Sequence, residues 1–333
     1  MRLLRLPVVA FLGVRLGGLV TGSPASAAGD LRVALGRPAA IIVPTFITQG
    51  PDGALWFTDL GTKGNPGSVG RITTSGKVTL YTGGGIDGPV GITVGPDGAL
   101  WFTNSNGDSI GRITTKGKIT SYTTRGIVDP IGITSGPLGE LWFTNAYNPG
   151  SFGLITTSGK IVLHTSTDID DPVGIVAGPE GTVWVTNAGT KTTKGSIAVL
   201  TINGKITAYS SGGINEPSGI TVGPDKDIWF TNYSGNSIGR ITTTGVGKIF
   251  TGNGIHEPYS ITTGPDGALW FTNYSGNSIG RITVSGKAAI FTGTGIDGPT
   301  GITSGPDGAL WFTNSGNNSI GRITILGKVT NYT

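Results

Sequence analysis

The sequence has 333 residues, with 60 glycines, 19 prolines, no cysteine and a formal net charge of +4. The lack of cysteine excludes a disulfide framework and any thiolate nucleophile or thiolate metal site. A composition this rich in glycine and proline, without a low-complexity tract, is typical of many short strands joined by tight turns, and 36% hydrophobic residues suffice for a large core.

Residues 1–28 have the features of a secretory signal peptide. Arg2 and Arg5 precede an apolar run over residues 6–14, and small residues follow at positions 25–28. Removing this segment takes away three arginines and no acidic residue, so the formal net charge falls from +4 to +1. We therefore expect a secreted or extracytoplasmic, monomeric protein, and the nearly neutral mature chain argues against nucleic acid or an anionic membrane as partner. No later segment reaches the roughly 18 apolar residues of a membrane span.

A short N-terminal segment, residues 29–43, precedes a repeat that occupies residues 44–333. All the tryptophans fall in one motif, at Trp56, Trp101, Trp142, Trp184, Trp229, Trp270 and Trp311. Each unit of the repeat resembles G-I-T-x-G-P-D-G-A-L-W-F-T-N, followed by S-I-G-R-I-T and G-K-I-T-x-Y-T. The spacing of about 42 residues is that of a propeller blade, whereas a parallel β-helix would need about half of it.

Four strands are predicted in each unit. In the second unit they are Gly91–Val94, Ala99–Thr103, Ser109–Thr114 and Lys118–Thr123, separated by turns rich in Gly, Pro, Asp and Asn. The expected fold is therefore all-β: a seven-bladed β-propeller with four antiparallel strands per blade. The tryptophans are expected to be buried between blades. The arginines of the third strands (Arg71, Arg112, Arg240, Arg281, Arg322) are also expected to pack between blades, and Leu154 and Val199 replace them in blades three and four.

Two segments compete for one edge of the ring. Lys328–Thr333 matches the fourth strand of the last blade, and Leu31–Leu35 could align with a fourth strand placed before blade one. Because the C-terminal segment matches the repeat better, we expect the ring to close without strand exchange.

Acidic and amide residues recur on one face of the expected ring. The loops that lead into blades two to seven carry an acid near the proline, at Asp87, Asp129, Asp171, Glu216, Glu257 and Asp297. The second strands end at Asp59, Asn104, Asn145, Asn187, Asn232, Asn273 and Asn314. These side chains could coordinate a hard cation or bind a polar ligand, or they could cap their own turns.

The chain has only two histidines for acid–base chemistry near neutral pH. His164 replaces the aromatic residue of a fourth strand and is expected to pack there. His256 adjoins Glu257 in a loop that leads into blade six, and it is the candidate catalytic residue. The candidate ligand-binding face comprises Glu216, Asn232, Glu257, Tyr259, Asn273, Thr300 and Asn314, with Glu216 and Glu257 as candidate metal ligands.

The repeated G-P-D-G-x-L-W-F-T, N-x-I-G-R-I-T and G-K-I-T-x-Y segments resemble those of the streptogramin B lyase (virginiamycin B lyase) family over residues 44–333. The resemblance implies a seven-bladed propeller and a magnesium-dependent enzyme that confers antibiotic resistance by opening a cyclic depsipeptide through elimination at its ester linkage. It also implies two catalytic histidines after the prolines that begin the last two blades, with metal-binding glutamates before the proline and after W-F-x-x. The residues here are Tyr259 and Thr300 at the histidine positions, and Gly298 and Asn314 at the metal positions of blade seven.

Two functions remain open at this stage. The first is a noncatalytic exported propeller that binds a surface polymer, a glycan or another ligand, which the missing histidines and the near-identical blades favour. The second is a magnesium-dependent carbon–oxygen lyase acting on a streptogramin B type cyclic peptide with a divergent site, which the family resemblance favours.

Overall fold

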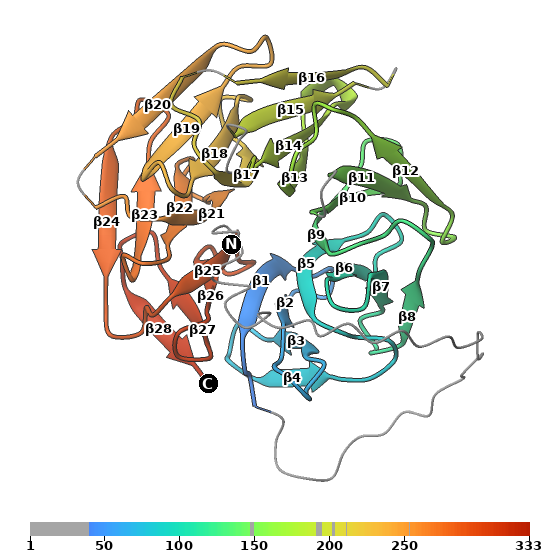
Figure 1. The fold of residues 1–333 in the computed structure, drawn as a ribbon. Helices are drawn as coiled ribbons and strands as arrows, with labels where there is room; N and C mark the ends of the chain where they lie inside the picture. The colour runs from blue at the N-terminus through green and yellow to red at the C-terminus, as the bar shows by residue number, and fades with distance from the viewer. Residues whose placement is uncertain (1–39, 147–149, 191–194, 202–203, 211, 253) are drawn as a thin grey trace.

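The computed structural model describes residues 40–146, 150–190, 195–201, 204–210, 212–252 and 254–333. In this part of the chain, strands β1 to β28 form seven separate four-stranded antiparallel sheets around a central axis (Figure 1). The predicted all-β, seven-bladed propeller is confirmed. The predicted signal peptide, and the segment Leu31–Leu35, lie outside the described residues.

Each blade takes four consecutive strands, whose bounds follow in chain order. Blades one to three contain β1 (Pro44–Gln49), β2 (Leu55–Asp59), β3 (Ser68–Ile72), β4 (Val78–Tyr81), β5 (Pro89–Val94), β6 (Leu100–Asn104), β7 (Ser109–Ile113), β8 (Ile119–Tyr122), β9 (Pro130–Ser135), β10 (Leu141–Asn145), β11 (Ser151–Ile155) and β12 (Ile161–Thr165). Blades four and five contain β13 (Pro172–Ala177), the 3-10 turn η2 (Pro179–Gly181), β14 (Val183–Asn187), β15 (Ser196–Leu200), β16 (Ile206–Tyr209), β17 (Pro217–Val222), β18 (Ile228–Asn232), β19 (Ser237–Ile241) and β20 (Gly247–Thr251). Blades six and seven contain β21 (Pro258–Thr263), β22 (Leu269–Asn273), β23 (Ser278–Ile282), β24 (Ala288–Thr292), β25 (Pro299–Ser304), β26 (Leu310–Asn314), β27 (Ser319–Ile323) and β28 (Val329–Tyr332).

The first strand of each blade lines the centre of the ring and the fourth lies at the rim (Figure 1). The second strand is the most deeply buried, because it has a strand on either side and a neighbouring blade over each face. Its phenylalanine requires the glycine of the third strand. In blade two a Cβ on Gly111 would lie 2.1 Å from the ring of Phe102, its partner in the strand register. The G in S-I-G-R-I is therefore a packing requirement.

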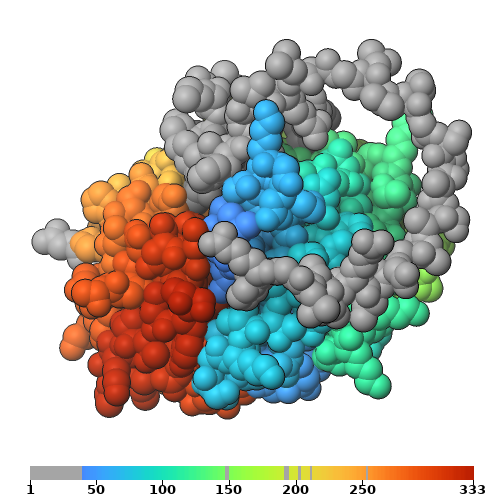
Figure 2. All heavy atoms as spheres, turned by 90° about the horizontal axis from the view of Figure 1, so that it is seen from below, coloured from blue at the N-terminus to red at the C-terminus, as the bar shows by residue number. Residues whose placement is uncertain are grey.

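A buried threonine joins each blade to the next. The threonine of W-F-T donates its hydroxyl hydrogen to the backbone carbonyl of the residue that follows the next blade's first proline, and at six junctions the distance is 2.6–2.9 Å. Thr313 makes this bond to Thr45 and so closes the ring. Strand β28 pairs with β27, as expected for closure without exchange. Figure 2 shows the last blade, in red, lying directly against the first, in blue to cyan.

One packing prediction needs correction. Six tryptophans are almost fully buried, but Trp142 of blade three is partly exposed because it borders a cavity. The third-strand arginines lie on the same face of their sheets as the tryptophans, as Arg112 does opposite Trp101. Each lies partly exposed and forms an ion pair with an aspartate in the turn between the first two strands of its own blade, as Arg112 does with Asp97 at 2.6 Å.

Candidate functional site

The loops that precede each blade's first strand and those that follow each second strand emerge on one face of the ring, which we call the loop face. Its centre is apolar. The buried residues there are Val43, Leu60, Val90, Ile131, Ala146, Ala188, Tyr233 and Tyr259. They come mainly from two repeat positions, the residue after the first strand's proline and the residue after the second strand's last amide. A ligand at the loop face would therefore meet an apolar floor.

Acidic residues stand in a strained backbone conformation around this floor. The residue before the proline has a left-handed φ of 46–50° at Asp129, Asp171, Glu216 and Glu257. Such a φ costs a non-glycine residue roughly 1–2 kcal/mol. It turns the carbonyl toward the next loop of the same blade, where it accepts a backbone N–H, as Glu257 does from Tyr274 at 3.1 Å. In blade seven Gly298 holds the same position with φ 53°.

Glu257 is held on this face by groups from two blades. The hydroxyl of Tyr233 donates to its Oε2 at 2.9 Å, and Ser275 donates to the same oxygen. Its backbone N–H donates to Asn236 Oδ1 at 2.7 Å. Since Tyr233 and Asn236 belong to blade five, Glu257 bridges two blades. Glu216 is held more simply, by the hydroxyl of Ser234 in its own blade.

The tyrosines beside Glu257 stay protonated at neutral pH. Burial, reinforced by the Glu257 hydrogen bond and charge, raises the pKa of Tyr233 far above its ordinary value. Burial is also the main cause of the raised pKa of Tyr259, with a smaller effect from Tyr274. The pKa of Tyr274 is raised first by burial and then by the charges of Glu257 and Asp297. These phenols can donate hydrogen bonds, but they are poor bases.

The amides at the ends of the second strands are buried and bonded within the fold. Asn273 donates to Gly254 O at 2.8 Å and to Ser278 Oγ at 3.0 Å, and its Oδ1 accepts the N–H of His256 at 3.1 Å. Asn232 and Asn314 make the same three contacts in their blades. All three are fully buried, so they fix the shape of the loop face from below. Direct ligand contact by these amides stays a prediction.

Asp59 takes the amide position in blade one. Its carboxylate accepts the backbone N–H groups of Ile42 and Val43, where the other blades have a loop from the preceding blade. Burial raises the pKa of Asp59 despite these bonds. An acid in place of the amide thus caps the segment that enters the ring.

The structure buries both positions at which the family resemblance implies a histidine. Tyr259 is 3% exposed and packs against Phe46 and Tyr233, with ring centroids 6.0 and 6.2 Å away. Thr300 is fully buried, and its hydroxyl donates to Pro44 O at 3.1 Å and lies 2.8 Å from Thr313 Oγ1. Both carbonyls also accept the hydrogen bonds that join neighbouring blades.

The two histidines lie in different environments. His256 is exposed on the loop face, next to Glu257, and its Cβ lies close to Gly276. His164 lies in β12 and stacks on Phe152 and Trp142, with ring centroids 5.3 and 5.9 Å away. The prediction that His164 packs on the outer strand is confirmed. A catalytic role for His256 stays a prediction.

The described residues offer magnesium no ready-made cage. No three of the described histidine, aspartate and glutamate side chains gather in a group that could hold a metal ion. The two candidate ligands Glu216 and Glu257 are each already bonded to hydroxyl donors. Because a hard cation needs several converging oxygens, this donor set fits magnesium poorly, and we derive no step through a metal.

The virginiamycin B lyase family model matches residues 32–211 and 188–333. The chain belongs to the virginiamycin B lyase family. A structure described as streptogramin B lyase is 31% identical with a TM-score of 0.75, over 89% of this chain and 95% of that chain. Virginiamycin B lyase from Staphylococcus aureus is 34% identical with a TM-score of 0.75, over 84% and 94% of the two chains.

A third structure shows a catalytically inactive histidine-to-alanine variant of the Staphylococcus aureus virginiamycin B lyase with quinupristin. It is 32% identical to this chain with a TM-score of 0.75, over 86% of this chain and 97% of that chain. No curated protein sequence matches the chain significantly. Within the described residues, no helix is long and apolar enough to cross a membrane.

The residues that bind the carboxylates of Glu216 and Glu257 were not predicted from the sequence. The signal was present, because N-Y-S-G follows the second strand only in blades five and six, at residues 232–235 and 273–276. These are also the two blades whose entering loop has glutamate before the proline. The tyrosine and serine of this motif supply the hydroxyls that bind Glu216 and Glu257.

Proposed function

We propose that this member of the family is an exported propeller that binds a ligand at its loop face without breaking it, and that the ligand is a surface polymer or glycan. The observation that carries the proposal is the burial of Tyr259 and Thr300, the residues at the implied histidine positions. Elimination at an ester requires a base that reaches the proton beside the carbonyl. A buried phenol with a raised pKa and a buried, hydrogen-bonded threonine are both unsuited to that task.

The chemistry of the loop face supports binding of a polar polymer. Held carboxylates and protonated phenols surround an apolar floor, a combination that suits a hydroxyl-rich chain with apolar ring faces. Residues 96–114, 265–283 and 306–324 are nearly identical, so several blades can offer the same weak contacts to successive units of a polymer. Export is proposed on the features of residues 1–28 alone.

A second candidate is a divergent carbon–oxygen lyase, which the family membership favours. In that case His256 and Glu257, adjacent on the loop face, would be the residues to supply acid–base chemistry. Fold and family alone do not establish an activity, so the two candidates need a direct test.

The deciding experiment incubates the purified chain, with and without residues 1–28, with a streptogramin B antibiotic and magnesium. Mass spectrometry follows the linear product, beside a chelator control and the Staphylococcus aureus virginiamycin B lyase as the positive control. We expect the antibiotic to stay intact. Magnesium-dependent linear product would overturn the proposal, and loss of that product in His256→Ala would locate the divergent site.

Binding is tested separately, by screening glycans and soluble cell-surface polymers against the same protein. We expect Glu257→Gln to weaken binding at least about tenfold, since it removes a charge-assisted acceptor. Glu180→Gln is the matched control, because Glu180 is an exposed acid in the turn between β13 and β14 on the opposite face. Equal losses in both variants would contradict a site on the loop face.

A further inference from the structure

Five blades share a three-residue link that defines what blade three lacks. In these blades the tryptophan Nε1 donates to an aspartate Oδ1 at 2.9–3.0 Å. The third-strand arginine donates through Nε to a carboxylate of the same turn at 2.5–2.6 Å. The guanidinium carbon of Arg112 also lies 5.9 Å from the ring of Trp101. In four of these blades one aspartate thus receives both the tryptophan N–H and the cation, and in blade five Arg240 donates to Asp227 and lies 3.5 Å from Asp225, the partner of the tryptophan.

Blade three keeps the tryptophan and a carboxylate but has lost the cation. Leu138 stands where the repeat has aspartate, and Glu140, two residues later, accepts the Nε1–H of Trp142 at 2.7 Å. Leu154 stands where the repeat has arginine. Glu140 is only 7% exposed, and no described lysine, arginine or histidine forms an ion pair with it. A carboxylate this buried is costly unless a cation compensates it.

A cavity of about 560 Å³ opens beside this carboxylate, between blades three and four. In other blades the fourth-strand aromatic fills the equivalent space. A Cβ on Gly117, for example, would lie 2.6 Å from Tyr81 of the preceding blade. At the corresponding Gly204 no described residue comes within 4 Å of such a Cβ. His164 holds the place of the aromatic residue there and stacks on Phe152 and Trp142.

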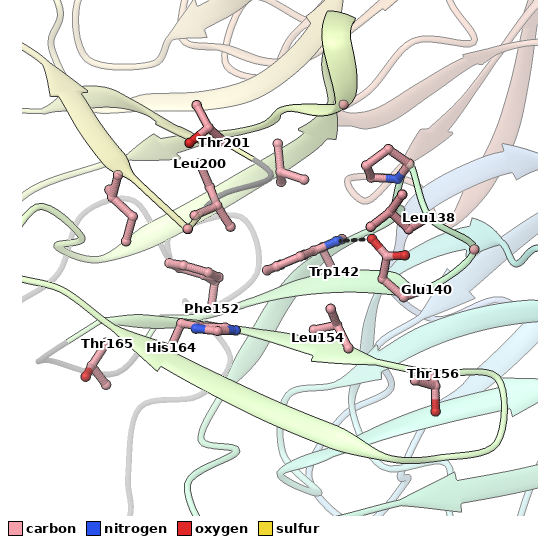
Figure 3. A pocket seen from close by; sticks show the side chains of 16 residues that line it. Leu138, Glu140, Trp142, Phe152, Leu154, Thr156, His164, Thr165, Leu200 and Thr201 are labelled. Atoms are coloured by element: carbon pink, nitrogen blue, oxygen red, sulfur yellow. Dashed lines mark hydrogen bonds between the residues drawn. The ribbon is translucent and has the colours of Figure 1, made fainter.

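The walls of the cavity are aromatic and aliphatic, with Glu140 as the acidic group. Figure 3 shows the flat rings of Phe152 and His164 below Leu200, with Trp142 beside Phe152 and its bond to Glu140 drawn as a dashed line. The cavity is lined by residues of β10, β11, β12, β14, β15 and β16 and by turns on the face opposite the loop face, and it shares no residue with the candidate site above.

We propose that this cavity binds a small organic cation, an amidinium, guanidinium or ammonium group carried on an aromatic or aliphatic body. The charged head pairs with Glu140 in the place that an arginine side chain holds in five other blades. The body lies between the rings of Trp142, Phe152 and His164 on one side and Leu200 on the other. Aromatic faces attract cations, and the cavity has the size usual for small-molecule sites. An anion is excluded by the buried carboxylate, and a neutral ligand would leave it uncompensated.

The test uses benzamidine as the probe and benzamide, its neutral analogue of nearly the same shape, as the ligand control. Isothermal titration calorimetry on the full chain measures both dissociation constants. We expect benzamidine to bind at least about tenfold more tightly than benzamide, the factor expected from a charge-assisted hydrogen bond. No benzamidine binding at about 10 mM, or equal binding of the two probes, would overturn the proposal.

Three variants locate the site. Glu140→Gln keeps an acceptor for Trp142 but removes the charge, so benzamidine should bind at least about tenfold more weakly. Leu154→Arg restores the arginine of the repeat and supplies the cation that pairs with Glu140. His164→Tyr restores the aromatic residue of the repeat and fills the cavity. Each variant should abolish benzamidine binding. His256→Ala, on the loop face, should leave it unchanged. Unfolding curves confirm that each variant folds, and if one fails to fold the other two decide. Unchanged benzamidine affinity in the folded variants would overturn the proposal.

Discussion

The hydroxyl of Thr313 donates a hydrogen bond of 2.6 Å to the carbonyl of Thr45, 268 positions earlier in the chain. Thr231 makes the same bond to Tyr259, at 2.9 Å, between blades five and six. The junction that closes the ring therefore uses the same contact as a junction within the chain. No strand of the last blade's sheet comes from the N-terminal part of the described chain.

Replacing the closing threonine should destabilise the protein as much as replacing an internal one. Thr313→Val removes the donor to Thr45 and the acceptor of the Gly301 N–H, leaving buried groups unpaired. We expect a loss of about 1–3 kcal/mol in the free energy of unfolding, and a similar loss for Thr231→Val. Guanidinium unfolding followed by tryptophan fluorescence measures both. A much larger loss for Thr313→Val would mean that ring closure depends on this one contact.

Stability should fall at alkaline pH because of the loop-face tyrosines. The folded-state pKa values of Tyr233 and Tyr259 are raised, mainly by burial, whereas the unfolded phenols titrate near pH 10. The unfolded state therefore loses protons first, so this contribution is complete below about pH 10 and is lost as the pH rises further.

Variants can assign the alkaline effect. The free energy of unfolding, measured from pH 8 to 11, should fall less steeply above about pH 10 in Tyr259→Phe than in the wild type. Tyr81→Phe, on the outer strand β4, is the matched control and should keep the wild-type slope. Identical slopes in all three proteins would refute the assignment to Tyr259.

Acid should weaken the links in the turns between first and second strands. Although burial raises the pKa of Asp97, hydrogen bonds from Trp101 and Arg112 outweigh it and hold that pKa below its ordinary value, and Asp52, Asp266 and Asp307 behave alike. The unfolded carboxyls then take up protons first, so this stability is present above about pH 4 and is lost as the pH falls through the folded-state values.

An arginine variant tests the acid effect. Arg112→Met removes one of the groups that lower the pKa of Asp97, so the free energy of unfolding should depend less on pH below about pH 4. Arg125→Met is the control, since Arg125 is exposed in a loop and has no ion pair among the described residues. The assignment to the Arg112–Asp97 pair is wrong if the free energy of unfolding of both variants depends on pH below about pH 4 as that of the wild type does.

The tryptophans should not contribute equally to stability. Trp101→Ala empties a fully buried position and should cost about 3–5 kcal/mol. Trp142→Ala should cost at least about 1 kcal/mol less, because Trp142 already borders a cavity and loses fewer contacts. Chemical denaturation of both variants gives the comparison. Equal losses would indicate that the cavity beside Trp142 is closed in solution.

The architecture could be predicted from the sequence because each blade repeats the same packing arrangement. The seven tryptophan motifs, six W-F-T and one W-V-T, and the glycine–proline turns predicted the number of blades, the four strands in each and the ring closure without exchange. Such predictions depend on contacts within a unit of about 42 residues, which are visible as periodicity.

The contacts of the individual polar and aromatic residues could not be predicted in this way, because they depend on how neighbouring blades meet. The amides Asn232 and Asn273 belong to repeat positions that could face a ligand or the protein interior, and burial depends on loops that meet from different blades. The bond from Tyr233 to Glu257 likewise joins two blades. The cavity beside Glu140 arises because Leu154 and His164 fill space differently from the residues they replace, and the size of a gap depends on the three-dimensional packing of both neighbouring blades.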